Sequence, residues 1–308
     1  MNTTNHLAKY NTLPEFIFFG NYFYGICAVA LSAEAMLQQS VPLNGVLYFA
    51  TVFMATVLYY TYPYMLHVSA GSSNPRTRWY ARHYALMKWN QVVITFVLVL
   101  ALVVFLWQYG NTVRHMPALQ WLLVFIFPAA AALYYGTGSL FLKYNLRKTG
   151  WLKPFVIGFT WAGFVNVYPV VFYDLVHAVN YTPTLIGGLL FLKNFMFITV
   201  LCIMFDIKDY ASDYLSQVKT FVVRAGLRRT IFYILLPLAV TGLASFIVYG
   251  ATHQFSITKL ILNIIPFLLL MMVAFSLRKR RPVLYYLVII DGLMLVKAVC
   301  GSVAMMYF

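Results

Sequence analysis

The stretch TLIGGLLFLKNFMFITVLCIMF, residues 184–205, decides the fold class. Its only charged side chain is Lys193. At 1.5 Å per residue, a helix of this length spans about 33 Å, which is enough to cross the hydrocarbon core of a bilayer. The run is continuous rather than alternating, and it is too long for a strand of a membrane barrel. We therefore predict a transmembrane helix here.

Comparable apolar runs fill the rest of the chain, which has 308 residues, 62% of them hydrophobic and 9% charged. Soluble domains contain about 25% charged residues, so the composition excludes an ordinary soluble protein. We predict an all-α, multi-pass membrane bundle of about nine transmembrane helices, forming one domain over residues 1–308. The expected spans lie near 14–36, 43–66, 89–109, 118–142, 154–177, 184–205, 230–250, 258–277 and 282–305.

Two features of secreted proteins are not expected. The first residues lack a basic segment followed by a short apolar stretch and a cleavage site, so no removable signal peptide is predicted. Cys27, Cys202 and Cys300 each stand alone in an apolar segment. Neither a disulfide framework nor a thiolate metal site is predicted from such spacing.

The net charge of +15 is explained by membrane orientation. If the N-terminus is cytoplasmic, 18 of the 22 Lys and Arg residues fall in the N-terminal tail or in cytoplasmic connections. This asymmetry predicts an N-in, C-out protein of the inner or plasma membrane. No basic and aromatic repeat indicates a nucleic-acid partner. The two longest connections, 67–88 and 206–229, are both cytoplasmic in this topology, and long loops usually have functional roles.

Three of the seven acidic residues lie together, in FDIKDYASDYLSQVKT directly after the 184–205 run. The spacing of Asp206, Asp209 and Asp213 puts the carboxylates on one helical face. Mg²⁺ prefers oxygen ligands and is often held by one or two carboxylates together with substrate phosphates. We interpret the cluster as a magnesium site. The plainer alternative is a solvated helix end, with Lys208 and Lys219 as ion-pair partners.

This segment resembles the second aspartate-rich motif of the UbiA superfamily of intramembrane prenyltransferases. The family pattern Asp-x-x-Asp-x-x-x-Asp followed by Lys-Thr is filled by Asp206, Asp209, Asp213, Lys219 and Thr220, with Ser212 where Gly is usual. Residues 146–169 resemble the entry to the family's fifth helix, with Lys153, Pro154, Trp161 and Pro169 in the expected order. Residues 223–230 resemble the approach to its seventh helix.

The family's first aspartate-rich motif is degenerate in this chain. Asn74, Pro75, Arg76 and Thr77 match the tetrapeptide that usually follows that motif. Counting back from them, the expected aspartates fall on Tyr64, His67 and Gly71. His67 is an alternative metal ligand, although nitrogen is a poor ligand for magnesium.

The resemblance implies a Mg²⁺-dependent enzyme of the cytoplasmic membrane face. It implies transfer of a prenyl group from a polyprenyl diphosphate donor to a lipophilic or aromatic acceptor. Asp206, Asp209 and Asp213 would hold the metal, and Lys219 would act with them. Arg76, Arg78, Arg82 and Lys153 would bind the donor's diphosphate, since guanidinium groups grip phosphate bidentately. For Arg78 and Arg82, orientation in the membrane is an equally good explanation.

Several polar residues lie inside the apolar runs, where an ionisable group is costly and usually faces the bundle interior. We expect structural pairing for them rather than chemistry. Asp291 is a candidate partner for Lys297, but six residues along a helix is poor registry for direct contact. The residues concerned are Glu34, Asp174, Lys193, Asn194 and Asp291.

Three functional alternatives remain beside the transferase. One is an intramembrane terpene cyclase, in which the prenyl cation closes on itself without an acceptor. Another is a non-catalytic relative that binds an isoprenoid lipid or a membrane partner. A transporter is the third, and no pair of discontinuous helices at matching positions in two halves supports it. Donor length, acceptor identity and oligomeric state do not follow from the sequence.

Overall fold

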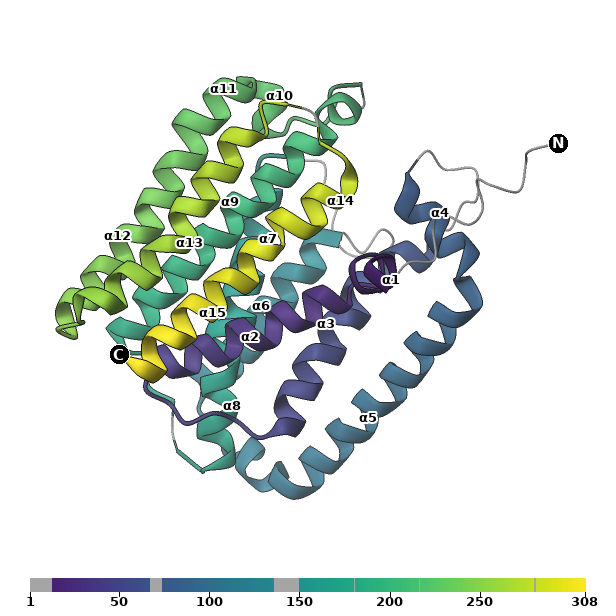
Figure 1. Cartoon of the computed structure of the whole chain (residues 1–308). Coiled ribbons are helices and arrows are strands. Elements are labelled where there is room, and N and C mark those ends of the chain that lie inside the picture. The colour runs from purple at the N-terminus through teal and green to yellow at the C-terminus, as the bar shows by residue number, and fades with distance from the viewer. Residues whose placement is uncertain (1–12, 67–73, 136–149, 180, 216, 280) are drawn as a thin grey trace. The chain divides into compact units, whose positions relative to one another are not determined.

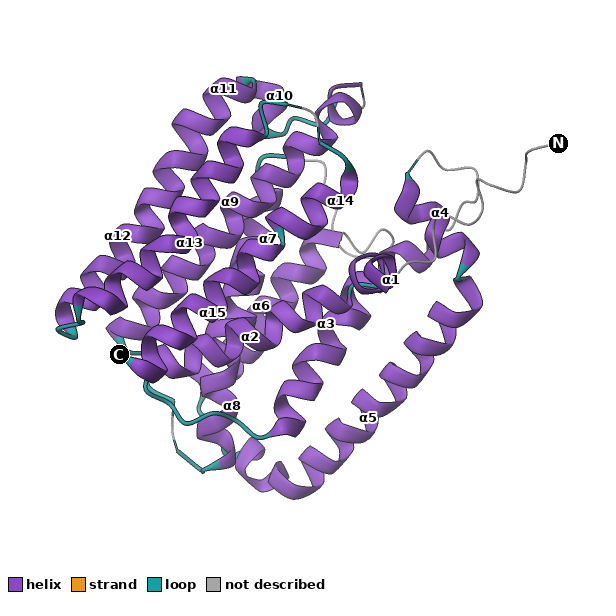
Figure 2. Cartoon of the chain, viewed as in Figure 1, coloured by secondary structure: helices purple, strands orange, loops and turns teal. Residues whose placement is uncertain are grey.

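A computed structural model describes residues 13–66, 74–135, 150–179, 181–215, 217–279 and 281–308. Within these ranges the chain is all-helical, with no strand (Figure 2). The first helices, seen in Figure 1, are α1 (Leu13–Phe19), α2 (Tyr22–Gln38), α3 (Val46–Leu66), α4 (Pro75–Arg82), α5 (Tyr84–Arg114) and α6 (Ala118–Tyr135). The later ones are α7 (Lys153–Ala162), η3 (Gly163–Val167), α8 (Tyr168–Val176), α9 (Leu185–Leu215), α10 (Phe221–Ala225), α11 (Leu227–Thr230), η4 (Ile231–Leu235), α12 (Leu236–Thr252), α13 (Ile257–Ser276), α14 (Val283–Tyr285), η5 (Tyr286–Ile290) and α15 (Gly292–Tyr307).

Seven helical segments in the described residues are long and apolar enough to cross a membrane, or eight if α1 and α2, bent by 63°, form one broken span. This confirms a multi-pass helical membrane protein. The predicted span 118–142 coincides with α6, whose apolar part, Ala118–Ala132, is shorter than the others. Residues 136–142 of that span lie outside the described part. The count of nine therefore stays a prediction.

The contacts divide the chain into two compact units, and each is described by itself. The first unit comprises Met1–Val29 and Asn44–Arg114, and the second comprises Ala30–Leu43 and His115–Phe308. Helix α2 is continuous from Tyr22 to Gln38 and so belongs to both. The prediction of one domain over 1–308 is not tested by this division.

Two of the π-helical turns follow from proline chemistry. The turn η3 ends two residues before Pro169, and η4 ends two residues before Pro237. A proline has no N–H, and its ring clashes with the carbonyl four residues back, so the preceding turn of helix widens. The third π-turn, η5, ends before Asp291 with no proline behind it, and we have no physical account of it.

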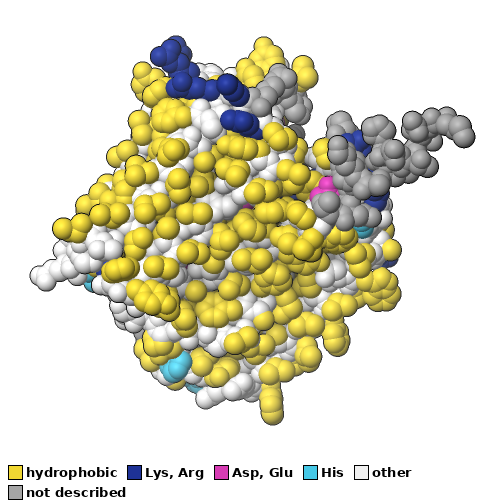
Figure 3. All heavy atoms as spheres, viewed as in Figure 1, with side chains coloured by type: hydrophobic (Ala, Val, Ile, Leu, Met, Phe, Trp, Pro, Cys, Tyr) yellow, Lys and Arg dark blue, Asp and Glu magenta, His cyan; other side chains and the backbone are white. Residues whose placement is uncertain are grey.

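In the second unit, α9 packs between α7 and α12. Most of its buried side chains are apolar, including Leu190, Phe197, Val200, Leu201, Ile203 and Met204, and four are polar or charged: Lys193, Asn194, Thr199 and Asp206. Large apolar side chains are also exposed, such as Tyr233 and Val240 on the π-turn and helix that follow α11. Figure 3 shows a mainly hydrophobic visible face, with Lys and Arg side chains gathered near α11. An apolar exterior is what a lipid-facing surface requires.

Candidate functional site

Helix α9 brings Asp206 into the interior of the second unit. Asp206 has 0% exposure, and its Oδ1 atom accepts a hydrogen bond from Nζ of Lys153 at 3.0 Å. Lys153 is the first residue of α7, so the packing of α7 on α9 makes this ion pair. The second carboxylate oxygen, Oδ2, is buried and has no hydrogen-bond partner in the described residues. A buried carboxylate oxygen without a donor is costly, so the site is suited to a further cation or donor.

The other two aspartates lie further along the same helix. Asp209 is about half exposed, with its Oδ2 atom 3.4 Å from Nζ of Lys208. Asp213 is partly buried. Burial raises the pKa of the Asp213 carboxyl, while the Lys153 ammonium lowers it and the Asp209 carboxylate raises it. All three aspartates belong to α9, and their spacing of three and four residues corresponds to one helical face.

Lys219 lies at the same end of the second unit. A Cβ atom on Gly150 would lie only 2.8 Å from the backbone nitrogen of Thr220 and 2.9 Å from the carbonyl carbon of Lys219. This close approach holds the segment before Lys153 against residues 219–220. Thr220 caps α10 by accepting a hydrogen bond from the backbone N–H of Val223, and the Lys219 side chain is exposed.

These residues suit a metal held jointly with a ligand rather than a closed metal cage. No three or more His, Cys, Asp or Glu side chains of the described chain gather closely enough to hold a metal ion by themselves. Magnesium does not require such a cage, because one or two carboxylates with waters and substrate phosphates are its usual ligands. The Oδ2 atom of Asp206, which has no hydrogen-bond partner in the described residues, is an oxygen ligand of the kind that Mg²⁺ prefers. One Mg²⁺ here would need waters or phosphate oxygens beside these carboxylates, and its binding stays a prediction.

Arg76, in the first unit, is occupied by internal hydrogen bonds. It is buried, and its Nε and Nη2 atoms donate to the carbonyl of Phe19 at 3.3 and 3.2 Å. Nη2 also donates to the carbonyl of Phe18 at 3.4 Å and to Oδ1 of Asn21. These carbonyls belong to the C-terminal turn of α1, which a cation stabilises. A diphosphate-binding role for Arg76 stays a prediction.

The other candidate residues from this part of the sequence lie in or around the degenerate motif. Tyr64, where the family has Asp, lies under Arg76 with its ring centroid 4.3 Å from the guanidinium carbon. Arg78 and Arg82 are exposed on α4. His67 and Gly71 lie outside the described residues.

Sequence reasoning missed the polar network around Asn21. The Asn21 amide donates to Oγ1 of Thr61 at 3.1 Å and to the hydroxyl of Tyr80 at 2.9 Å. The Tyr80 hydroxyl in turn donates to the Phe19 carbonyl at 2.9 Å. Burial raises the pKa of Tyr80 to about 12, although Arg76 lowers it. A buried asparagine in an apolar run was the one available signal, because such a group requires partners.

A buried ionic cluster lies in the second unit, defined by Glu34, Gln38, Lys193, Asn263 and Lys297. Lys193 Nζ lies 3.3 Å from Glu34 Oε1 and 2.6 Å from Gln38 Oε1, and Lys297 Nζ lies 2.6 Å from Glu34 Oε2. The Gln38 amide donates to Glu34 Oε1 and to Asn263 Oδ1, both at 3.0 Å. Lys193, the member of the cluster on α9, precedes Asp206 by 13 residues, which is about 20 Å along the helix.

This cluster agrees with the expectation of structural pairing for Glu34 and Lys193. Lys297 contacts Glu34 at hydrogen-bond distance, which is consistent with the poor registry expected between Lys297 and Asp291. Asp291 is buried. Asn194 is buried too, and its Oδ1 atom has no hydrogen-bond partner in the described residues.

Fold and site together define a multi-pass helical membrane protein whose second unit holds a lysine-paired aspartate at one end of α9. No protein-family model, curated protein or solved structure matches the chain.

Proposed function

We propose that the chain is an intramembrane prenyltransferase of the UbiA type. It would transfer a prenyl group from a polyprenyl diphosphate to a lipophilic or aromatic acceptor in a Mg²⁺-dependent reaction. The observation that supports this best is the buried Asp206, which has one oxygen paired with Lys153 and the other without a partner in the described residues. The resemblance of residues 206–220 to the family's second aspartate-rich motif supplies the reaction class.

In this reaction the acidic residues would bind the metal ion and the basic residues would bind the phosphate oxygens. Asp206, Asp209 and Asp213 would hold Mg²⁺, which supplies positive charge to stabilise the leaving diphosphate. Lys153 and Lys219 would bind further phosphate oxygens. The C–O bond of the donor breaks with its electron pair leaving on the diphosphate. The acceptor then forms the new bond to the prenyl carbon and releases a proton to solvent.

We propose that this site lies on the cytoplasmic face of the membrane. With the N-terminus inside, residues 67–88 and 206–229 both lie on that side, together with most of the Lys and Arg residues. The positive-inside bias is the physical reason.

Turnover by purified protein in nanodiscs tests the proposal. Labelled geranyl, farnesyl and geranylgeranyl diphosphates are supplied with Mg²⁺ and a panel of acceptors, and diphosphate release is measured. We expect release that stops in chelator and in the Asp209→Ala, Asp213→Ala double variant. Asp174→Ala, an acid-to-alanine change on α8, is the matched control and should keep activity. Donor consumption without any acceptor would indicate the cyclase instead.

A second candidate, a non-catalytic relative that binds an isoprenoid lipid, is favoured by one observation. The guanidinium of Arg76 is engaged by the Phe18 and Phe19 carbonyls and by Asn21, so this residue of the degenerate motif already has a structural role. Folded protein that releases no diphosphate from any donor, yet retains a prenyl lipid in chelator, would favour this candidate.

A further inference from the structure

A groove runs between α3 and α5 in the first unit. Its volume is about 540 Å³, within the roughly 300–1,000 Å³ typical of small-ligand sites. Residues from both helices line it: Leu58, Tyr62, Met65, Leu66, Tyr84, Lys88, Gln91, Val92, Thr95 and Phe96.

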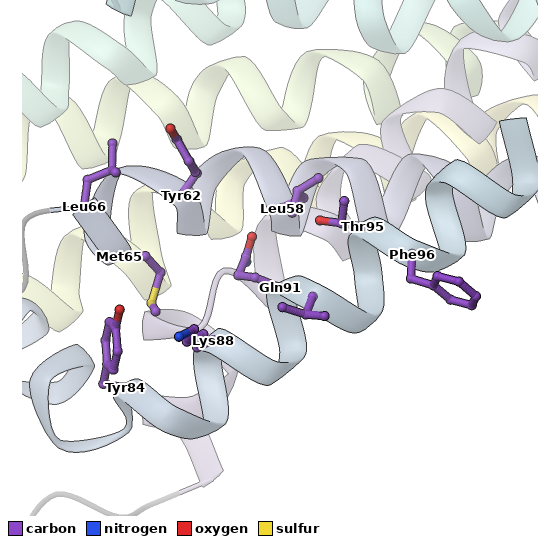
Figure 4. A pocket seen from close by; sticks show the side chains of 10 residues that line it. Leu58, Tyr62, Met65, Leu66, Tyr84, Lys88, Gln91, Thr95 and Phe96 are labelled. Atoms are coloured by element: carbon purple, nitrogen blue, oxygen red, sulfur yellow. The ribbon is translucent and has the colours of Figure 1, made fainter.

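The groove is polar at one end and apolar along its length. Figure 4 shows Tyr84 and Lys88 at one end and Thr95 and Phe96 at the other. Lys88 is exposed, and within the described residues it has no ion-pair partner. Among the described residues that line the groove, none is acidic. The polar end is therefore positively charged, with nothing in its lining to neutralise it.

Gln91 adds an unsatisfied donor one turn further along α5. Its side chain points toward α3 (Figure 4), and its Nε2 atom is buried without a hydrogen-bond partner in the described part of the chain. A buried amide N–H without an acceptor is costly. An acceptor oxygen in the groove would recover that cost.

The apolar part of the groove opens on a lipid-exposed helix. Only 6% of the apolar window of α5 is buried, although the helix has 31 residues. Val92 and Phe96 are 50% and 68% exposed. In a bilayer such a face contacts acyl chains, so a ligand in the groove would lie beside lipid tails.

We propose that this groove binds an anionic phospholipid of the surrounding membrane. Its phosphodiester would lie beside the Lys88 ammonium group. The phosphate oxygens would accept hydrogen bonds from the Gln91 amide and from the Tyr84 hydroxyl. One acyl chain would lie along Leu58, Val92 and Phe96. The single cation matches the single negative charge of a phosphodiester. A prenyl diphosphate carries about three negative charges, so Lys88 alone would leave most of that charge unpaired.

Lipid retention measures this directly. Protein in nanodiscs of equal phosphatidylglycerol and phosphatidylcholine is extracted in mild detergent, and co-purifying lipid is quantified by mass spectrometry. We expect phosphatidylglycerol to be retained over phosphatidylcholine in the wild type, and Lys88→Gln to lower that preference about tenfold. Arg114→Gln, which removes a cation at the other end of α5, is the matched control and should leave the preference unchanged.

Three results would overturn the proposal. One is equal retention of both lipids by wild-type protein. Another is an unchanged preference in Lys88→Gln. The third is displacement of the bound phosphatidylglycerol by added farnesyl diphosphate, which would identify the groove with a prenyl donor. Gln91→Leu provides a second variant, because it removes the buried donor without altering charge. It should weaken retention while keeping the thermal unfolding temperature.

Discussion

Lys297 Nζ lies 2.6 Å from Glu34 Oε2, although 263 residues separate the two in sequence. Both side chains are almost fully buried, and Lys193 contacts the other oxygen of the same carboxylate. One carboxylate therefore serves two ammonium groups in the interior of the second unit.

Glu34→Gln should strongly destabilise the protein. The substitution keeps the shape of the side chain but leaves Lys193 and Lys297 without a carboxylate. Breaking a buried ion pair by removing one partner costs about 3–5 kcal/mol. Denaturant unfolding in detergent measures the loss. Replacing Glu34 by Leu and both lysines by Met should recover most of it, since no buried charge remains. A Glu34→Gln variant as stable as the wild type would contradict the ionic role of the cluster.

Gly301→Ala should destabilise the same region for a steric reason. A Cβ atom on Gly301 would contact the carboxylate of Glu34 closer than any real Cβ atom does. Overpacking of this kind costs about 1–3 kcal/mol. Gly292→Ala is the matched control on the same helix, because a Cβ atom there meets nothing within 4 Å. The control should be neutral or slightly stabilising, and equal unfolding of the two variants would contradict the contact.

Arg76→Lys should reduce stability, whereas Arg78→Lys should not. A lysine is a point charge on a flexible stem and does not reproduce the fork that joins the Phe18 and Phe19 carbonyls to Asn21. We expect a loss of about 1–3 kcal/mol. Arg78 is exposed, so its replacement is a fair comparison. A higher donor KM in Arg76→Lys at unchanged stability would instead indicate contact with diphosphate.

Added Mg²⁺ with inorganic diphosphate should raise the thermal unfolding temperature of the wild-type protein. Ligands that bind only the folded state stabilise it by about 2.7 kcal/mol at a hundred times their Kd. Asp206→Asn should abolish the shift, because it alters the carboxylate whose Oδ2 atom lacks a partner in the described residues. The shift measures binding independently of turnover. A shift that survives in Asp206→Asn would place the metal elsewhere.

The C-terminus should be outside the cytoplasm. Fusion of a periplasmic phosphatase reporter after Phe308 should therefore give an active enzyme, whereas a reporter in the 206–229 connection should be inactive. The asymmetry of the Lys and Arg residues is the physical reason. The reverse pattern would invert the topology and move Asp206 to the outer face.

Sequence reasoning could predict the helical membrane class because long apolar runs have one structural solution in a bilayer. It could also predict the shared face of Asp206, Asp209 and Asp213, because local helix spacing fixes it. The ends of α9 show the limit: the predicted span stops at residue 205, whereas the helix continues to Leu215. A helix continues into polar residues as long as its backbone hydrogen bonds are made. Hydropathy marks the end of the apolar run and not the end of the helix.

Contacts between distant helices could not be predicted. The pairing of Lys297 with Glu34 depends on which helices adjoin and on their rotation, and a single sequence specifies neither. The same holds for Arg76, whose motif position suggested phosphate while its position in the fold gives it the carbonyls of α1.

The position of Glu34 also bears on how the protein is made. At a synthesis rate of roughly 5–20 residues per second, about 8–32 s pass between Glu34 and Lys193, and about 13–53 s between Glu34 and Lys297. During that interval Gln38, one turn away on α2, is already synthesised and donates its side-chain N–H to Glu34. Insertion of α2 therefore precedes pairing of its carboxylate. Lys193 on α9 balances the single charge of Glu34, and Lys297 on α15 then adds a second ammonium group at the other carboxylate oxygen. Truncation before α15 would leave Oε2 of Glu34 without the ammonium group of Lys297.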